Sequence, residues 1–515
     1  MTVDATPYDQ IRYPGQAYRQ AHPDRLAALA PLLGLQPAPT DRCRVLELGC
    51  GTGSNLIPMA WSLPESQFVG IDLAARPIAE GQAAIETIGL TNIRLAAMDL
   101  MDFAESMGPF DYIIAHGLYS WVPATVRQRI MALCRSHLAE HGVAFISYNA
   151  YPGCHLRDMV REMLLYHVHN APDPQTRIRQ GQALLQFLAQ GQDEPDEYGG
   201  LLAKELQRVM HYATGHFYHD DLAEINQPFY FHQFIEQAEA AGLQFLSEAE
   251  YFMIRTDSFP EPTARVLDSL GANILIQQQY LDFLRCRRFR QTLLCRKERT
   301  VNHQVEARRM ADFAFSSPGR TETAELDFSP DREIEFQGEQ GSRLRTTDPL
   351  AKAALACLEA RWPQAVPFPE LLNQALDRLG RQPTATDVDD LGAILQQCFG
   401  SGVVELHLRP PQLVLEPGPR PLASPCARLQ AAAGDLITTL RHRTVCLADI
   451  PARQLLELLD GTRTVAELVV DLGRKIREQA AAPAEPSGPN PESEVDEQQV
   501  RIMLADFARL GLLIR

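Results

Sequence analysis

A short apolar run that leads into three closely spaced glycines is the strongest chemical signal in the sequence. Residues 45–53 read Val-Leu-Glu-Leu-Gly-Cys-Gly-Thr-Gly. Glycines in such a turn permit positive φ angles and let the backbone approach a ligand closely. The carboxylate of Glu47 would repel a phosphate, whereas it attracts a cofactor that carries an ammonium and a sulfonium group. The alternative for the glycines alone is a tight turn without a ligand. The candidate cofactor-binding residues here are Glu47, Gly49, Cys50, Gly51 and Gly53.

Two aspartates follow at the ends of the next two apolar runs. Asp72 ends the run that contains Gly70 and Ile71, where an acidic side chain can accept hydrogen bonds from both ribose hydroxyls. Asp99, followed by Leu100, ends the third run and can accept a hydrogen bond from the adenine amino group. Capping of a helix or a turn explains each aspartate when it is taken alone. The ordered set of acidic residues predicts S-adenosylmethionine as the cofactor.

The elements that must position these side chains are five β-rich runs separated by helical stretches. Continuous apolar runs are typical of a parallel sheet covered on both faces, and ligands bind at the carboxyl ends of such strands. A nicotinamide dinucleotide is disfavoured because the turn lacks the G-x-G-x-x-G spacing. The five runs are Arg44–Leu48, Phe68–Asp72, Ile93–Ala97, Tyr112–Ala115 and Val143–Tyr148.

Aromatic and polar residues follow the fourth and fifth runs, at the edge where the acceptor of a methyl group would lie. Packing of a lid against a helical insertion is the alternative role for each of these side chains. His116 is expected either over the adenine or as a polar turn residue. If the acceptor is a lysine, it must lose a proton, and an apolar aromatic channel favours its neutral form and holds alkylammonium groups. The catalytic candidates are Tyr119, Trp121, Tyr148 and Asn149.

The later part of the chain predicts further modules. We expect a methyltransferase-type sheet domain over 1–155, a helical insertion over 156–240 and a return of the chain over 241–303 that completes the sheet. A polar linker over 304–348 then precedes helices at 349–360, 368–379 and 387–399. The linker leads to winged-helix-like α+β modules over 349–412 and 427–515, the second with a disordered loop at 480–494.

Composition limits the possible locations and partners. A formal net charge of −17 disfavours duplex nucleic acid as a partner. No apolar window approaches a membrane span, and no secretory signal is visible, so we expect a cytoplasmic protein. His211, His216 and His219 lack a partner at metal-ligand spacing, and the cysteines form no C-x-x-C pair, so no metal site is expected. The arginines between 285 and 299 are expected on a solvated face.

Beyond these signals, the chain resembles bacterial class I methyltransferases with a methyltransferase regulatory domain. That group includes rickettsial protein-lysine methyltransferases that modify outer-membrane proteins. The family usually has tryptophan after Tyr-Pro-Gly, where this chain has Cys154. The segments that carry the resemblance include 47–53, 110–114, Tyr13-Pro14, Gln20–Leu26, Ala115–Pro123, Ser147–Gly153, Asn226–His232 and Phe289–Cys295.

The resemblance implies methylation of lysine amines in a protein or peptide, such as an outer-membrane protein before its export, by an enzyme that can form a homodimer. The large part of the chain outside the minimal cofactor fold agrees with a polypeptide substrate. Two alternatives stay open: a small-molecule or RNA methyltransferase, and a cofactor-binding regulatory protein with little turnover.

Overall fold

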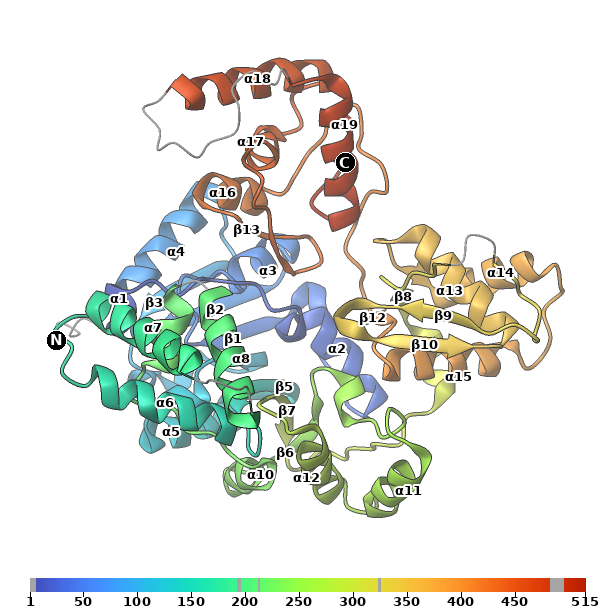
Figure 1. The fold of residues 1–515 in the computed structure, drawn as a ribbon. Coiled ribbons are helices and arrows are strands. Elements are labelled where there is room, and N and C mark those ends of the chain that lie inside the picture. The colour runs from blue at the N-terminus through green and yellow to red at the C-terminus, as the bar shows by residue number, and fades with distance from the viewer. Residues whose placement is uncertain (1–5, 192–195, 212–213, 323–325, 482–494) are drawn as a thin grey trace.

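A seven-stranded sheet forms the centre of the computed structural model, which describes residues 6–191, 196–211, 214–322, 326–481 and 495–515. The strand order is β3-β2-β1-β4-β5-β7-β6 (Figure 1). Strands β1 to β5 are parallel, and β7 is antiparallel to both of its neighbours. This arrangement confirms the expected Rossmann-like sheet. The strands are β1 (Arg44–Leu48), β2 (Gln67–Asp72), β3 (Ile93–Ala97), β4 (Phe110–Ala115), β5 (Leu138–Asn149), β6 (Leu243–Glu248) and β7 (Phe289–Arg296).

The parallel strands are buried because crossover helices cover the sheet. These helices are α3 (Leu56–Ser62), α4 (Ala75–Ile88) and α5 (Ala124–His137), and the central strands β1 and β4 are almost wholly buried. In the register, Glu47 of β1 lies opposite Gly70 of β2 and Ile114 of β4. The carboxyl ends of these strands therefore meet at one edge, which is where open α/β sheets bind their ligands.

The basic stretch expected on a solvated face instead contributes buried ion pairs. Arg290 on β7 is buried, and it contacts Glu248 at 2.6 Å and Asp282 at 2.8 Å. Arg287 is also buried and lies 3.1 Å from Asp282. The expectation was wrong for Arg287 and Arg290, because β6 pairs along the outer side of β7, while Arg288 is exposed as expected. Burying such charges is tolerable only when they are paired and hydrogen-bonded.

The insertion after β5 is helical, as predicted. Helices α6 (Cys154–Val168), α7 (Pro174–Gln190) and α8 (Glu197–His211) pack around a small apolar core of their own. A short helix α9 (Thr214–His216) leads into a five-residue π-helical turn at Phe217–Asp221. The remaining helices of this half are α1 (Pro7–Gln10), α2 (Pro23–Leu32), α10 (Phe231–Ala240), α11 (Glu261–Leu270) and α12 (Ile274–Arg285).

The segment expected as a linker, 304–348, contains strands. β8 (Ala314–Ser316) pairs with β11 (Val366–Pro367) and β12 (Glu405–His407), while β9 (Ile334–Gln337) pairs with β10 (Arg343–Thr346). β8 was not predicted for two reasons: the segment is polar, and its pairing partner β12 lies far away in the sequence. Helices α13 (Pro349–Arg361), α14 (Phe368–Leu379) and α15 (Asp387–Gly400) match the three predicted helices closely.

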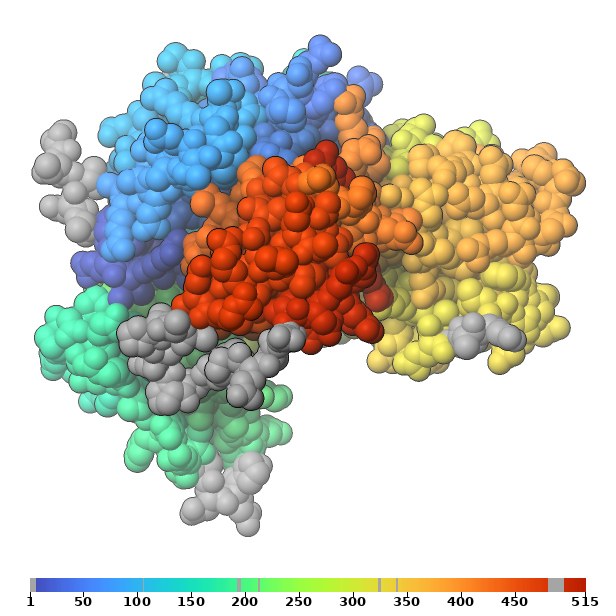
Figure 2. All heavy atoms as spheres, turned by 90° about the horizontal axis from the view of Figure 1, so that it is seen from above, coloured from blue at the N-terminus to red at the C-terminus, as the bar shows by residue number. Residues whose placement is uncertain are grey.

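The C-terminal domain has a separate apolar core and is seated beside the N-terminal half (Figure 2). It comprises α16 (Pro425–Ala433), the hairpin β13 (Leu436–Thr438) and β14 (Thr444–Cys446), α17 (Ile450–Leu458), α18 (Val465–Ala481) and α19 (Glu497–Leu510). The loop predicted at 480–494 lies outside the described residues from 482 onwards. Within the described part of the chain, no helix has the length and apolar character needed to cross a membrane.

Candidate cofactor and acceptor site

The glycine turn after β1 adopts the conformation that its sequence predicts. Gly49, Gly51 and Gly53 have φ angles of 75°, 53° and 72°, a region that other residues enter at a cost. A Cβ added at Gly53 would lie 2.8 Å from the Leu95 side chain, whereas a Cβ at Gly51 would meet nothing within 4 Å. The space beside Gly51 is therefore open, as a backbone that approaches a ligand requires.

Glu47 lies beneath this turn as a buried carboxylate with one free oxygen. Its side chain is 4% exposed, and its Oε1 accepts a hydrogen bond of 2.8 Å from the Asn55 amide. Its Oε2 is buried without a hydrogen-bond partner. Burial, with a smaller contribution from the charge of Asp72, raises the pKa of Glu47 to about 8. A buried unpaired carboxylate is costly, and a ligand ammonium group would satisfy it.

The two aspartates lie at the ends of β2 and β3. Asp72 accepts hydrogen bonds from the backbone N–H groups of Gly51 and Ala74, each at 2.8 Å, and burial raises its pKa. Asp72 therefore also braces the glycine turn. Asp99 is exposed and caps a short turn by accepting a hydrogen bond from Met101 N at 2.9 Å, and Leu100 beside it is half-buried. Both carboxylates keep lone pairs for further donors, so the residues present fit an adenosine cofactor with an amino-acid end.

His116 follows β4 on the same edge of the sheet. Its ring centroid lies 3.7 Å from that of Tyr18 and 6.0 Å from that of Phe289, and its Nδ1 is buried without a hydrogen-bond partner. Burial lowers the pKa of His116 to about 3. The imidazole is therefore neutral at physiological pH and does not repel a neighbouring sulfonium. Cys50, in the glycine turn, is buried.

Two of the four catalytic candidates are fully buried, and the other two are buried and half-buried. Tyr119 is fully buried and donates a 2.8 Å hydrogen bond to Gln237 on α10. Tyr148 is also buried, and its ring stacks on that of Phe234 with a centroid distance of 4.0 Å. Both tyrosines thus make the contacts of the packing alternative. Trp121 is half-buried, and the buried Asn149 donates a 2.7 Å hydrogen bond to Asn226. Cys154 is buried, with its Sγ 3.1 Å from the Arg288 carbonyl oxygen.

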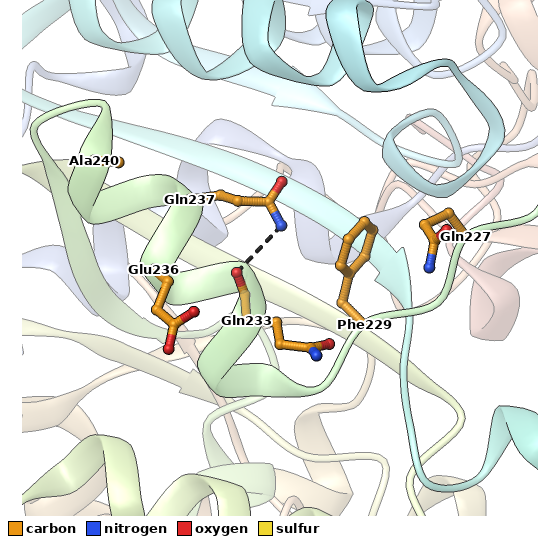
Figure 3. A pocket seen from close by; sticks show the side chains of 6 residues that line it. All are labelled: Gln227, Phe229, Gln233, Glu236, Gln237 and Ala240. Carbon is orange, nitrogen blue, oxygen red and sulfur yellow. Dashed lines mark hydrogen bonds between the residues drawn. The ribbon is translucent and has the colours of Figure 1, made fainter.

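A shallow cavity of about 480 Å³ lies on the α10 side of Tyr119 (Figure 3). Its walls carry amides and one carboxylate around a single aromatic ring, and none of the predicted cofactor residues lines it. The cavity is therefore separate from the cofactor candidates. Its lining residues are Gln227, Phe229, Gln233, Glu236, Gln237 and Ala240.

The N-terminal segment over the glycine turn was not identified from the sequence as part of the site. A Cβ on Gly15 would lie 2.1 Å from the Ser54 hydroxyl, so the segment passes directly over the turn. Tyr18 N donates a 3.0 Å hydrogen bond to Asn55 Oδ1. The segment also brings Tyr8 onto His219, with ring centroids 4.1 Å apart, beside the π-helical turn. The tyrosines around Pro14 were a usable signal, but nothing in the sequence says which surface they cover.

Asp220 in the π-helical turn was also missed. Among the described residues, no hydrogen bond or ion pair to its carboxylate is found, and burial raises its pKa to about 6. It lies close enough to Tyr13 and Tyr18 that its charge, after burial, raises the pKa of both phenols. π-Helical turns often mark functional sites. Arg157 and Arg208 also lie within electrostatic range of Asp220, and a carboxylate beside aromatic rings can attract an alkylammonium group.

Comparisons with known proteins identify the family of the chain. The family model of a methyltransferase domain matches residues 45–142, that of a predicted methyltransferase regulatory domain matches 214–296, and that of a PKMT C-terminal winged helix domain matches 419–512. The uncharacterized protein RP789 of Rickettsia prowazekii is 32% identical over 383 residues, which cover 73% of this chain and 69% of that protein. RP028 of the same organism is 35% identical over 46% of this chain and 96% of its own length.

A solved structure matches nearly the whole chain. PKMT2 from Rickettsia typhi in complex with AdoHcy superimposes with a TM-score of 0.84 at 28% identity, over 98% of this chain and 100% of that one. The match includes the C-terminal domain as well as the sheet, so it extends to the domain organisation. The chain therefore belongs to the S-adenosylmethionine-dependent class I methyltransferases of the PKMT type, which carry a methyltransferase regulatory domain and a C-terminal winged helix.

Proposed function

We propose that this enzyme transfers the methyl group of S-adenosylmethionine to the side-chain amine of lysines in a protein. The main support is Glu47, a buried carboxylate whose Oε2 has no hydrogen-bond partner and which lies below the glycine turn, where the space beside Gly51 is open. The AdoHcy complex of the similar PKMT2 supports the same cofactor class. When bound, S-adenosylmethionine supplies an electrophilic methyl group on a sulfonium.

The residues proposed to hold the cofactor lie at the ends of separate strands, and each meets a different part of the cofactor. Glu47 meets the ammonium group and Asp72 the ribose hydroxyls, while Asp99 and Leu100 meet the adenine. The backbone of Gly49, Cys50, Gly51 and Gly53 forms the turn against which the amino-acid end lies. His116 stays neutral beside the sulfonium.

We place the acceptor amine between Tyr18, His116 and Asp220. The Tyr18 ring contacts His116, and burial, together with the charges of Glu47 and Asp220, raises the pKa of its phenol, so both carboxylates lie within electrostatic range of Tyr18. A lysine arrives as an ammonium ion, which Asp220 and the tyrosine rings attract. With its raised pKa, Asp220 can take the proton that the amine must lose before it attacks the methyl carbon. Trp121 and Asn149 remain candidates for the walls of this channel.

The substrate is proposed to be a polypeptide because several domains lie outside the cofactor fold. The finer parts of this proposal are an outer-membrane protein before its export as the target, a cytoplasmic location and a homodimer. The target rests on the family resemblance, and the location rests on the sequence pattern. Light scattering on a sizing column tests the dimer, and fractionation of cells tests the location. The identity of modified proteins in mass spectrometry tests the target.

The decisive experiment follows the methyl group. The purified enzyme is incubated with S-adenosylmethionine labelled in its methyl group and with a bacterial lysate, and the protein fraction is hydrolysed to amino acids. We expect labelled methyllysine with the wild-type enzyme and none with Glu47→Gln. Label found only in RNA or in small molecules would overturn the lysine assignment while leaving the cofactor assignment intact. Tight cofactor binding without label in any fraction would instead support a regulatory protein.

A further inference from the structure

The hairpin of the C-terminal domain reaches the cofactor side of the molecule. β13 and β14 lie next to α3 (Figure 1), and the residues that connect them, 439–443, include the buried His442. Ala17 N in the N-terminal segment donates a 2.8 Å hydrogen bond to the Thr444 hydroxyl. The His22 and His442 rings lie 4.9 Å apart. The hairpin is therefore packed against the same segment that covers the glycine turn.

A chain of hydrogen bonds runs from this hairpin to Glu47. His442 Nε2 lies 2.9 Å from Asn55 Oδ1, and Asn55 Nδ2 donates a hydrogen bond of 2.8 Å to Glu47 Oε1. Burial lowers the pKa of His442 well below its usual value, so the ring is neutral. Since an amide oxygen has no hydrogen to give, His442 Nε2 must carry the hydrogen of this contact.

These contacts decide which way the Asn55 amide faces. Its oxygen accepts from Tyr18 N, which can only donate, so its NH₂ group faces Glu47, and His442 Nε2 meets the same oxygen as a second donor. The opposite orientation would turn the oxygen towards the carboxylate and the NH₂ group towards two donors, leaving several buried polar groups unsatisfied. The free Oε2 of Glu47 keeps its place only while Oε1 is held.

We propose that His442 is a positioning residue of the cofactor site: the C-terminal domain fixes the Asn55 amide and, through it, the carboxylate that binds the cofactor ammonium group. The cofactor site is thus completed by a domain that lies far from it in the sequence. Cofactor binding and docking of the C-terminal domain are then coupled, because each stabilises the arrangement that the other needs. This proposal rests on the cofactor assignment and does not depend on the acceptor being a lysine.

His442 has a strained backbone conformation, and ion pairs hold the residues on either side of it. His442 has a φ angle of 55°, a left-handed conformation that is costly outside glycine. Its two neighbours are arginines, Arg441 and Arg443, which lie 2.6 and 2.9 Å from the Glu405 carboxylate of β12. Arg19 of the N-terminal segment pairs with the same carboxylate. The strained residue is therefore anchored from both sides.

The test measures binding of S-adenosylhomocysteine by calorimetry, since this compound carries the same amino-acid end and does not react. His442→Leu keeps the bulk and removes the donor, and we expect it to weaken binding roughly tenfold. His442→Gln restores an N–H at a similar reach and should recover most of the loss. Cys446→Ser is the matched control in the same hairpin: this exposed side chain contacts the Asp435 carboxylate instead of Asn55 or the N-terminal segment, and the affinity should stay at the wild-type value.

A double-mutant cycle distinguishes an effect of His442 that acts through Asn55 from a general effect on folding. If His442 acts through the amide, His442→Leu should have no further effect on binding in an Asn55→Ala background. Wild-type affinity in His442→Leu, failure of His442→Gln to recover binding, or equal losses in both backgrounds would each overturn the proposal. Because the readout is binding, a failure of lysine methylation in the lysate experiment would leave this result interpretable.

Discussion

Replacing Glu47 by glutamine should stabilise the ligand-free protein while removing cofactor binding. The pKa of Glu47 is raised from 4.5 to about 8 in the folded chain, mainly by burial. Between these values the folded state keeps a proton that the unfolded state releases, so the stability of the wild type falls as pH rises from 4.5 to 8. At about 1.4 kcal/mol per unit, this cost is below about 1 kcal/mol at pH 5 and reaches about 3 kcal/mol at pH 7. Glutamine can still accept from Asn55 and does not titrate.

The same substitution should greatly weaken cofactor binding, because it removes the negative charge that would pair with the ammonium group of the ligand. Removing one partner of a buried ion pair costs about 2–4 kcal/mol, which corresponds to a dissociation constant raised roughly 30- to 1000-fold. Thermal unfolding of both proteins without ligand at pH 5 and pH 7 measures the first effect, and calorimetry with S-adenosylhomocysteine measures the second. For a domain of about 300 residues, we expect the variant to unfold roughly 3 °C or more above the wild type at pH 7, with a smaller difference at pH 5.

Either of two results would refute this reasoning. A variant that is less stable than the wild type at pH 7 would mean that the carboxylate is satisfied in the ligand-free protein. Unchanged affinity for S-adenosylhomocysteine would mean that Glu47 does not meet the ammonium group. Glu86→Gln on the exposed side of α4 is a matched control that should change neither quantity.

Three further substitutions test other parts of the structure. Arg290→Met should destabilise the protein by about 3–5 kcal/mol in urea unfolding, because Glu248 and Asp282 would stay buried with Arg287 as their one remaining cationic partner among the described residues; an unchanged midpoint would contradict the buried pairs. Gly53→Ala should lower the unfolding temperature and weaken S-adenosylhomocysteine binding in calorimetry, because the residue has a φ of 72° and a Cβ there would meet the Leu95 side chain. Wild-type values of both quantities would contradict this conformation of the glycine turn. In the wild type, methylation should rise through pH 6 as Asp220 ionises, and Asp220→Asn should lower the rate and remove that limb from the pH profile, with cofactor affinity unchanged.

The sheet was predictable because its strands are local signals that are buried on both faces. The runs Arg44–Leu48 and Ile93–Ala97 are strands with the same bounds in the structure. The three helices of the middle module were predicted to within one residue of their bounds. The glycine turn was predictable for a similar reason, since glycine has a conformational meaning that does not depend on distant residues.

Contacts between distant segments were not predictable. β8 was lost in the expected linker because its partner is β12, and the arginines of β7 were assigned to solvent because β6 was not known to pair outside them. Tyr119 and Tyr148 had the right composition for an acceptor channel, but α10 packs over both of them. The roles of Asp220 and of the N-terminal tyrosines depend on which surfaces fold over the glycine turn.

The sequence by itself determined the class of sheet and the order of its strand ends. It also contained the three carboxylates that predict an adenosine cofactor. These features depend on short-range periodicity and on the types of single residues. Only the tertiary structure decided which residues close over that cofactor. The orientation of the Asn55 amide depends on Tyr18 and on His442, which lies 387 positions away in the chain. No local pattern records such a contact, because it exists only when separately folded domains pack together.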